Sequence, residues 1–140
     1  MVAMDYRLAT DADLAGCLEL EWTRSRDDLA WHVAGDLLYV AVDGGAVVGF
    51  ARLESFWKPM PYLALIVVRD GARGAGVGSG LLAFVCGDLR ARGYRTLLSS
   101  TTGGEDGPRR WHLRNGFADA GVLRGLNGGG VDELFYTLEL

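Results

Sequence analysis

The sequence predicts a mixed α/β fold of the α+β type, and three features of the chain lead to that prediction. Predicted strands and helices follow the order β-α-α-β-β-β-α-β-α-β-β, which is neither all-β nor a regular βαβ alternation. The 140 residues contain no repeat or linker, so we predict a single domain over residues 1–140. Hydrophobic residues make up 49% and charged residues 23%, which is ordinary for a globular protein with a core of normal size.

The first elements follow from capping and spacing. Residues 6–9 are typical of a short strand, and Thr10 then provides a helix N-cap with Asp13 three positions later. Apolar residues recur at helical spacing after this cap, which indicates a first helix. The mixed pattern of residues 24–34 predicts a short, irregular second helix.

Three strands are predicted in the middle of the chain. The apolar runs 37–42 and 46–54 flank Asp43-Gly44-Gly45, which favours a β-hairpin. The prolines within 58–61 are expected to break the chain, because each fixes φ and removes a hydrogen-bond donor. The continuous apolar run 62–69 then predicts an interior strand.

The last elements complete a mixed sheet. We expect a helix over about 78–92, a strand over 95–100, a helix between Pro108 and Gly116, and strands over 117–123 and 131–140. The chain is thus predicted to form a mixed central sheet of about six to seven strands flanked by about four helices.

The composition excludes several classes of protein. A net charge of −4 does not suit a nucleic-acid-binding protein. The opening residues carry Asp5 and Arg7 without a long apolar run, and no segment is long enough to span a bilayer, so we predict a cytoplasmic protein without membrane attachment. Cys17 and Cys86 match no metal or redox spacing, which predicts buried thiols and no metal site.

The segment from residue 67 to residue 82 carries the strongest chemical signal. An apolar strand is followed by a loop of small residues and then by a helix. The first turn of a helix has N–H groups without intrahelical partners, and the helix dipole adds positive charge there, so small side chains make the turn suitable for a pyrophosphate. The loop has no lysine for a P-loop, and Ser79 stands where the dinucleotide motif needs its third glycine. Val77 and Leu81 exclude a nucleophile elbow at Ser79.

The remaining pattern, Arg73-x-x-Gly76-x-Gly78, resembles the R/Q-x-x-G-x-G/A signature of the GNAT N-acyltransferases. The resemblance extends along the chain to the opening segment 6–13, to Val48-Gly49-Phe50 and to Asn115-Gly116-Phe117. It implies the GNAT acyl-CoA N-acyltransferase fold and an acyltransferase that uses acetyl-CoA.

The resemblance also implies the residues that hold the cofactor. Arg73 opens the loop and adds charge toward the phosphates. Val67 and Val68 pair their backbone with pantetheine, and one of their N–H groups polarises the thioester carbonyl. The backbone amides expected to bind the CoA pyrophosphate are those of Gly74, Ala75, Gly76, Val77, Gly78 and Ser79.

The catalytic residues are less clear, because the chain departs from the family pattern. Many members have a tyrosine acid four residues before the Gly-Phe glycine, and here that residue is His112. His112 is either this acid or a cation at the carboxyl end of a short helix. The run 62–68 lacks the carboxylate that members often place on this strand. Glu54 is the nearest candidate for the base that deprotonates the amine, with Glu19, Glu21 and Glu133 as further candidates.

The predicted function is transfer of the acetyl group of acetyl-CoA to a primary amine of a small molecule or peptide. Neither cysteine has an activating neighbour, so we expect direct attack in a ternary complex. The alternative is a non-catalytic acyl-CoA-binding sensor or regulatory module of the same fold. The apolar last strand is compatible with a homodimer or with an internal strand. The sequence does not identify the amine.

Overall fold

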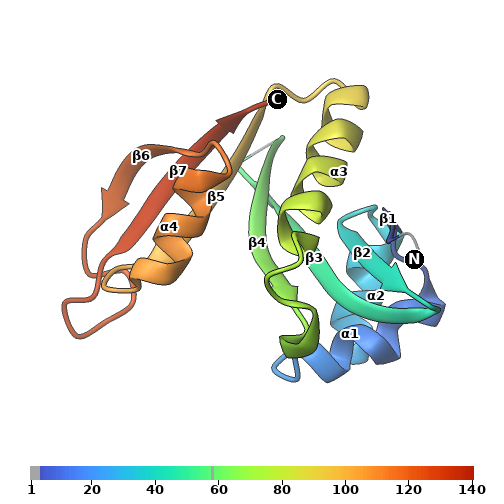
Figure 1. The fold of residues 1–140 in the computed structure, drawn as a ribbon. Helices are drawn as coiled ribbons and strands as arrows, with labels where there is room; N and C mark the ends of the chain where they lie inside the picture. The colour runs from blue at the N-terminus through green and yellow to red at the C-terminus, as the bar shows by residue number, and fades with distance from the viewer. Residues whose placement is uncertain (1–3, 58) are drawn as a thin grey trace. The chain divides into compact units, whose positions relative to one another are not determined.

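Seven strands form one mixed sheet in the order β1-β2-β3-β4-β5-β7-β6. The computed structural model describes residues 4–57 and 59–140 (Figure 1). Strands β4 and β5 are parallel, whereas the pairs β1–β2, β2–β3, β5–β7 and β6–β7 are antiparallel. The predicted mixed α+β fold is therefore confirmed. The elements are β1 (Asp5–Leu8), η1 (Asp11–Asp13), α1 (Leu14–Leu20), α2 (Arg26–Ala34), β2 (Leu38–Asp43), β3 (Ala46–Phe56), β4 (Met60–Val68), η2 (Asp70–Ala72), α3 (Val77–Ala91), β5 (Thr96–Thr102), α4 (Asp106–Arg114), β6 (Ala118–Leu123) and β7 (Glu133–Glu139).

The chain divides into two compact units. The first comprises Met1–Glu54 and Ala64–Asp88, and the second comprises Ser55–Leu63 and Leu89–Leu140. Strands β3 and β4 and helix α3 each contribute residues to both units. The prediction of one domain over the whole chain stays a prediction, and each unit is described by itself.

The first unit begins with the predicted cap. Asp13 accepts hydrogen bonds from the backbone N–H of Thr10 at 2.8 Å and from Arg7 Nη1 at 2.7 Å. The Arg7 guanidinium holds the pKa of the Asp13 carboxyl below its usual value. Helix α2, predicted to be irregular, is a regular helix because the Ser25 hydroxyl accepts a hydrogen bond from the Asp28 N–H and caps it.

The core of the first unit lies between the β1–β3 strands and the helices α1 and α2. Gly49 of β3 shows how closely the strands pack, because a Cβ there would lie 2.9 Å from the Val67 carbonyl oxygen. The buried core residues come from β2, β3, α1 and α2 and from the residue after β1, namely Ala9, Leu14, Cys17, Leu29, Leu38, Val40, Val47 and Phe50.

The second unit is built on β5, β7 and β6, with α4 packed on one face. Buried Tyr136 of β7 stacks on His112 of α4, with ring centroids 4.7 Å apart, and Phe117 contacts the same imidazole edge to face. The antiparallel register pairs Ser100 with Phe135. Because side chains alternate along strands, these two residues lie on the face of the sheet opposite α4.

Most predicted boundaries differ from the structure by one or two residues, and three of them have a plain physical reason or bear on the site. Strand β4 begins at Met60, because the extended conformation accommodates the fixed φ of Pro61. Strand β3 continues to Phe56. Strand β7 begins only at Glu133, because the Asp132 carbonyl still accepts a hydrogen bond from the Gly103 N–H at 2.8 Å and belongs to the loop.

Candidate active site

The glycine-rich loop of the first unit has the backbone geometry that an anion site needs. The chain leaves β4 through the 3₁₀ turn η2, and α3 begins at Val77. Gly74 and Gly76 have φ values of 81° and 77°, in the left-handed region that favours glycine. A methyl group at either position would find no heavy atom within 4 Å, so the loop surface is open. A ligand can therefore approach this backbone closely.

The amide hydrogens of this loop are the donors of the candidate site. Within the described residues, the N–H groups from Gly74 to Ser79 have no backbone acceptor, and the first helical bond of α3 is donated by Gly80 to the Gly76 carbonyl at 2.9 Å. The amino end of a 15-residue helix also carries positive partial charge. Buried Val77 and Leu81 hold the first turn against the first unit, which fixes the donors. The loop thus fits a pyrophosphate group.

Arg73 and Arg69, which flank the loop, both have hydrogen-bond partners within the protein. The Arg73 guanidinium pairs with Asp70, at 3.1 Å between Nη2 and Oδ1, and its Nε donates to the Val68 carbonyl at 3.2 Å. Both side chains of this ion pair are exposed. The Arg69 N–H donates to the Val48 carbonyl at 2.7 Å, which anchors the carboxyl end of β4 where Val67 and Val68 lie.

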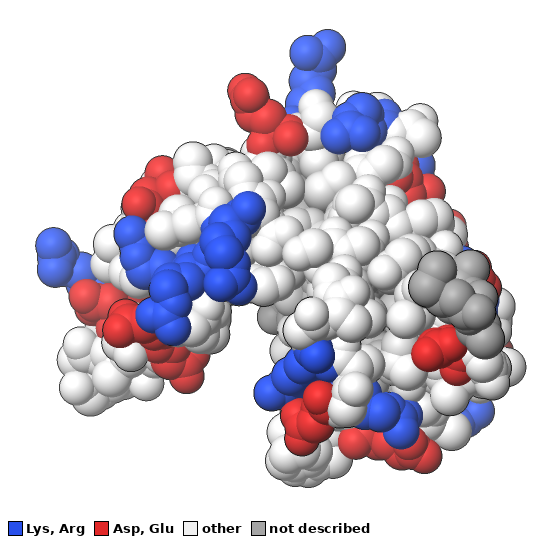
Figure 2. All heavy atoms as spheres, in the orientation of Figure 1, with Lys and Arg blue, Asp and Glu red and all other residues white. Residues whose placement is uncertain are grey.

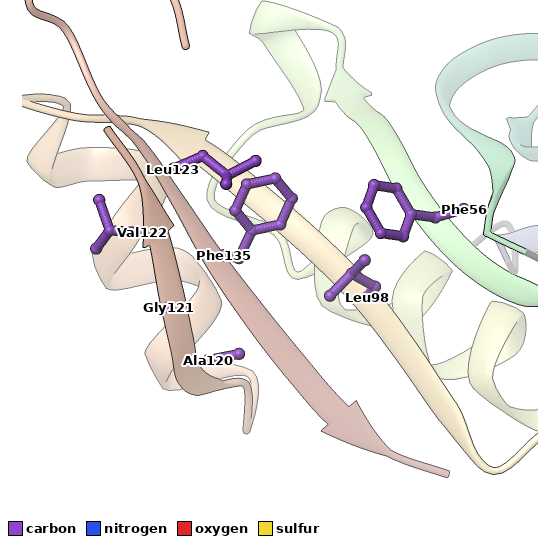
Figure 3. A pocket seen from close by; sticks show the side chains of 7 residues that line it. All are labelled: Phe56, Leu98, Ala120, Gly121, Val122, Leu123 and Phe135. Atoms are coloured by element: carbon purple, nitrogen blue, oxygen red, sulfur yellow. The ribbon is translucent and has the colours of Figure 1, made fainter. Parts of the chain in front are cut away.

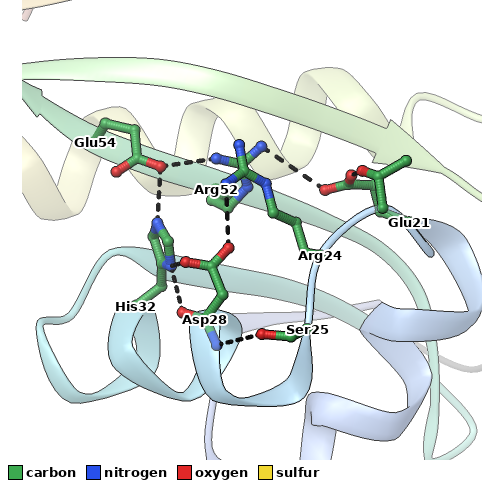
Figure 4. Close-up of polar contacts among 8 residues, drawn as sticks. Glu21, Arg24, Ser25, Asp28, His32, Arg52 and Glu54 are labelled. Carbon is green, nitrogen blue, oxygen red and sulfur yellow. Dashed lines mark hydrogen bonds and ion pairs between the residues drawn. The ribbon is translucent and has the colours of Figure 1, made fainter.

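Glu54, the predicted base, belongs to a polar cluster of the first unit (Figure 4). Its Oε1 lies 2.7 Å from Arg52 Nη1 and 2.8 Å from His32 Nε2. The His32 Nδ1 donates to the Asp28 carbonyl at 2.7 Å, so the contact between Nε2 and the carboxylate must hold a second proton. Arg52 Nη1 donates to the same Glu54 oxygen, so this oxygen accepts a hydrogen bond from Arg52 and shares a proton with His32.

Arg52 connects this cluster to α1. Only 7% of its side chain is exposed, and its Nη2 lies 3.7 Å from Glu21 Oε2. Arg52 Nε and Glu21 Oε2 are buried without a hydrogen-bond partner. An unpaired buried polar atom costs free energy of folding. The Arg52–Glu54 and His32–Glu54 contacts are therefore the main interactions that stabilise the cluster.

His112, the predicted acid, is buried in the second unit. Its Nδ1 donates to the Pro108 carbonyl at 2.7 Å, and its Nε2 lies 2.7 Å from the Ser99 hydroxyl. Burial lowers the pKa of the His112 imidazole below its usual 6.5. The neutral ring is thus favoured. The single Ser99 hydroxyl proton has two acceptors within reach, and it goes to the nearer His112 Nε2 at 2.7 Å rather than to the Leu63 carbonyl at 3.2 Å. In this form the ring has no proton to donate at Nε2.

Basic side chains gather over α4, as Figure 2 shows. Arg109 is committed to Asp119, with 2.6 Å between Nη1 and Oδ1. Arg110 and Arg114 are exposed, and among the described residues neither has a carboxylate within ion-pair distance. These two arginines are available to an anion.

A hydrogen-bonded chain in the second unit was only partly anticipated from the sequence. Tyr62 Oη lies 2.6 Å from Ser100 Oγ, and the Ser100 hydroxyl donates to Glu133. Asn127 Nδ2 donates to the other Glu133 oxygen at 2.9 Å. Glu133 was a further candidate for the base, whereas sequence reasoning missed Tyr62. The sequence signal that points to this chain is the run of serines and threonines over residues 99–102, at the carboxyl end of β5.

Neither cysteine has the character of a nucleophile. Both thiols are buried, and burial raises the pKa of Cys17 to about 12. Among the described residues, no group of three or more His, Cys, Asp or Glu side chains could hold a metal ion. No helix in the described part of the chain is long and apolar enough to cross a membrane.

Several solved structures with this fold are described as acetyltransferases. The chain is 25% identical to an N-acetyltransferase from Staphylococcus aureus, with a TM-score of 0.81 and 98% of each chain covered. It is also 25% identical to a ribosomal-protein-alanine N-acetyltransferase from Brucella melitensis, with a TM-score of 0.83 and 97% and 99% covered. A structure from Salmonella typhimurium that contains its cofactor acetyl-CoA is 24% identical, with a TM-score of 0.80 and 99% and 94% covered, and supports the fold.

The two structures at 25% identity are N-acetyltransferases, which indicates the class of protein, an acyltransferase. The sequence matches the model of the acetyltransferase (GNAT) family over residues 7–117, and the chain belongs to this family. No curated protein sequence matches the chain significantly. Family membership agrees with the resemblance carried by Arg73, Gly76 and Gly78.

Proposed function

We propose that this protein transfers the acetyl group of acetyl-CoA to a primary amine of a small molecule or peptide, by direct attack in a ternary complex. The observation that carries the proposal is the run of N–H groups from Gly74 to Ser79 without backbone acceptors, at the amino end of α3. When bound, acetyl-CoA supplies the thioester carbon that the amine attacks. The acetyl-CoA in the Salmonella typhimurium structure supports this choice of donor.

The loop residues have distinct roles in this proposal. The amides from Gly74 to Ser79 donate hydrogen bonds to the pyrophosphate, and the left-handed glycines allow neighbouring N–H groups to converge. Arg73 leaves Asp70 and contacts phosphate, which costs little because that ion pair is exposed. The backbone of Val67 and Val68 pairs with the pantetheine arm and orients the thioester carbonyl.

The acceptor must lose a proton as it attacks, and the role of Glu54 as base stays a prediction. The Glu54 Oε1 already accepts a hydrogen bond from Arg52 and shares a proton with His32. Because both side chains contact Oε1, this oxygen has no free lone pair with which to take a proton from the acceptor. We therefore propose that Glu54 chiefly holds Arg52 and His32 in position. A Glu54→Gln variant tests this by its effect on kcat.

The role of His112 as acid also stays a prediction. To protonate the leaving thiolate, His112 must first take a second proton and pass it through Ser99, because its Nε2 faces that hydroxyl. Burial opposes the charged ring. A thiol has an ordinary pKa of about 8.5, so its thiolate is a good leaving group near neutral pH without an acid. We propose that neutral His112 mainly fixes Ser99.

The acceptor class rests on the family and on one relative's name. The Brucella melitensis protein is a ribosomal-protein-alanine N-acetyltransferase, which supports testing peptide amines here. A small amine is equally compatible with the family. The cytoplasmic location, the absence of nucleic-acid and membrane partners, and a homodimer stay predictions.

The test combines binding and turnover. Isothermal titration measures acetyl-CoA binding to the wild type and to an Arg73→Glu/Gly76→Asp double variant, which puts carboxylates into the cradle. An Arg90→Glu/Gly87→Asp double variant makes the same charge change further along α3 and serves as the control. Chromatography then measures CoA release with a panel of amines.

The outcomes separate the two functional hypotheses. We expect the wild type and the control to bind acetyl-CoA, the cradle variant to lose binding, and CoA release to require an amine. Binding without turnover on any amine would identify an acyl-CoA-binding module. No binding by the wild type would refute the proposal and leave the loop as a turn.

A further inference from the structure

One face of the sheet in the second unit carries an apolar groove beside the hydrogen-bonded chain of Tyr62, Ser100 and Glu133. The groove encloses about 330 Å³ (Figure 3), which is at the small end for ligand sites. It lies on the face opposite α4, since Leu98 and Phe135 alternate with residues that face the helix. The residues that line it are all apolar, namely Phe56, Leu98, Ala120, Gly121, Val122, Leu123 and Phe135.

The groove and the hydrogen-bonded chain are adjacent. The Phe56 ring lies 6.0 Å from the Tyr62 ring and 6.3 Å from the Phe135 ring, measured between centroids. Leu98 is opposite Tyr62 in the parallel pairing, and Ser100 is opposite Phe135 in the antiparallel pairing. Tyr62 therefore lies beside the apolar groove and is also the first member of the hydrogen-bonded chain that leads to the Glu133 carboxylate.

The available donors and acceptors determine which group donates each hydrogen bond in this chain. A carboxylate accepts only, so the single Ser100 hydroxyl proton goes to Glu133. Ser100 must then accept the Tyr62 hydroxyl proton, at 2.6 Å between the oxygens. The Tyr62 oxygen still has a lone pair with which it can accept a hydrogen bond from an N–H outside the chain.

We propose that this face binds the acceptor, which is a small primary amine joined by a short link to an aromatic or branched aliphatic group. This inference rests on the proposed function and names its substrate class. The apolar group occupies the groove, and the amine donates to Tyr62 Oη. Glu133 complements the positive charge of the ammonium, and the groove lining offers no cation to an acidic substituent.

The proton transfer balances along the chain. An ammonium first loses one proton to water, because only the neutral amine can attack. As its nitrogen bonds to the acetyl carbon, the nitrogen becomes acidic and gives a second proton to the Tyr62 oxygen, while the C–S bond of the thioester breaks and CoA leaves as the thiolate. Tyr62 passes its own hydroxyl proton to Ser100, and Ser100 passes its proton to Glu133, which becomes a carboxylic acid. Both hydroxyls are restored. Tyr62 is the catalytic residue, and Ser100 and Glu133 are positioning residues that act through it.

The test uses the full chain with acetyl-CoA and three amines: 2-phenylethylamine, ethylamine and a short peptide that begins with Phe. Glu133→Gln and Tyr62→Phe remove the ends of the chain with little change in shape. Glu139→Gln on the same strand and Tyr94→Phe are the matched controls. Each variant is first checked for an unchanged acetyl-CoA Kd and melting temperature.

We expect 2-phenylethylamine to have a kcat/KM at least about tenfold above that of ethylamine and above that of the peptide. Glu133→Gln and Tyr62→Phe should lower kcat by about 100-fold or more, and the fall of wild-type kcat at acidic pH should disappear in Glu133→Gln. Phe56→Ala should raise KM for 2-phenylethylamine and leave ethylamine unaffected, whereas Trp57→Ala, which removes an exposed neighbouring ring, should change neither.

Several results would overturn the inference while the proposed function stands. These are efficient acetylation of ethylamine alone, preference for the peptide, or loss of kcat in Glu54→Gln but not in Glu133→Gln. If acetyl-CoA is not turned over with any amine, the proposed function fails. Titration of 2-phenylethylamine into the wild type and Phe56→Ala then decides about the groove, because equal or absent binding refutes it.

Discussion

Gly76→Ala should weaken acetyl-CoA binding without unfolding the protein. Gly76 has φ of 77°, and an added methyl group would meet no heavy atom within 4 Å, so the substitution creates no clash. Holding an L-residue in the left-handed region costs about 1–2 kcal/mol. Gly76 is exposed, and within the described residues the N–H groups from Gly74 to Ser79 have no backbone acceptor, so the free protein relaxes and the strain appears on binding.

The size of the effect follows from these terms. Strain alone corresponds to about a 5- to 30-fold higher Kd, because 1.4 kcal/mol is a factor of ten. If the backbone relaxes instead, the strain is released but one N–H turns away from the pyrophosphate, and a hydrogen bond to a charged group worth about 1.5–3 kcal/mol is lost, which is about a 10- to 150-fold higher Kd. We therefore expect Kd to rise by about 5-fold to 150-fold.

Gly71→Ala provides the matched control. Gly71 lies in the same loop, its φ is outside the left-handed region, and a methyl group there would also have no neighbour within 4 Å. Isothermal titration should give a Kd within about twofold of wild type for this variant. Equal Kd values for Gly71→Ala and Gly76→Ala would refute the assignment of the cradle to the left-handed backbone.

Three further predictions concern stability and reactivity. Burial lowers the His112 pKa below 6.5, so the unfolded state binds this proton first as the pH falls. The free energy of unfolding should therefore decrease from about pH 6.5 downward, and it should decrease less in His112→Gln. Urea titration at several pH values measures both. Asp13→Asn should cost about 1–2 kcal/mol at neutral pH, since it removes the negative charge and one of the two oxygens that accept from Arg7 and the Thr10 N–H, and the difference should vanish as the pH falls through the lowered Asp13 pKa; a constant difference would contradict this. In a Cys86→Ser background, Cys17, with a pKa of about 12, should react with a thiol reagent at pH 8 only after unfolding, and rapid labelling of the native protein would show that its burial is misjudged.

The parts of the fold that were predicted correctly depend on neighbouring residues. Asp43-Gly44-Gly45 joins β2 and β3, and both glycines have positive φ, as a tight hairpin turn requires. The start of α3 was placed within a residue, because the glycines and the apolar spacing act over a single turn. The regular helix α2 was missed, since its apolar pattern is weak and its start is decided by the Ser25 cap.

The surroundings of the polar groups were not predictable in the same way. His112 lies on a short helix with arginines on either side, so the sequence left open a role as an exposed cation. The structure turns its ring toward Ser99 and Tyr136 instead. Glu54 was chosen for its place in sequence, and its partners Arg52 and His32 became apparent only when α2 packed beside β3.

The sequence by itself determined the family, the mixed fold and the loop that fits a pyrophosphate. Such a loop is specified locally, because the φ of each glycine and the free N–H groups of a helix start depend on a few adjacent residues. The tertiary structure alone decided which carboxylates have partners and which hydroxyls connect. Tyr62 and Ser100 are 38 residues apart, and Ser100 and Glu133 are 33 apart, so only the order and register of β4, β5 and β7 bring them into one hydrogen-bonded chain.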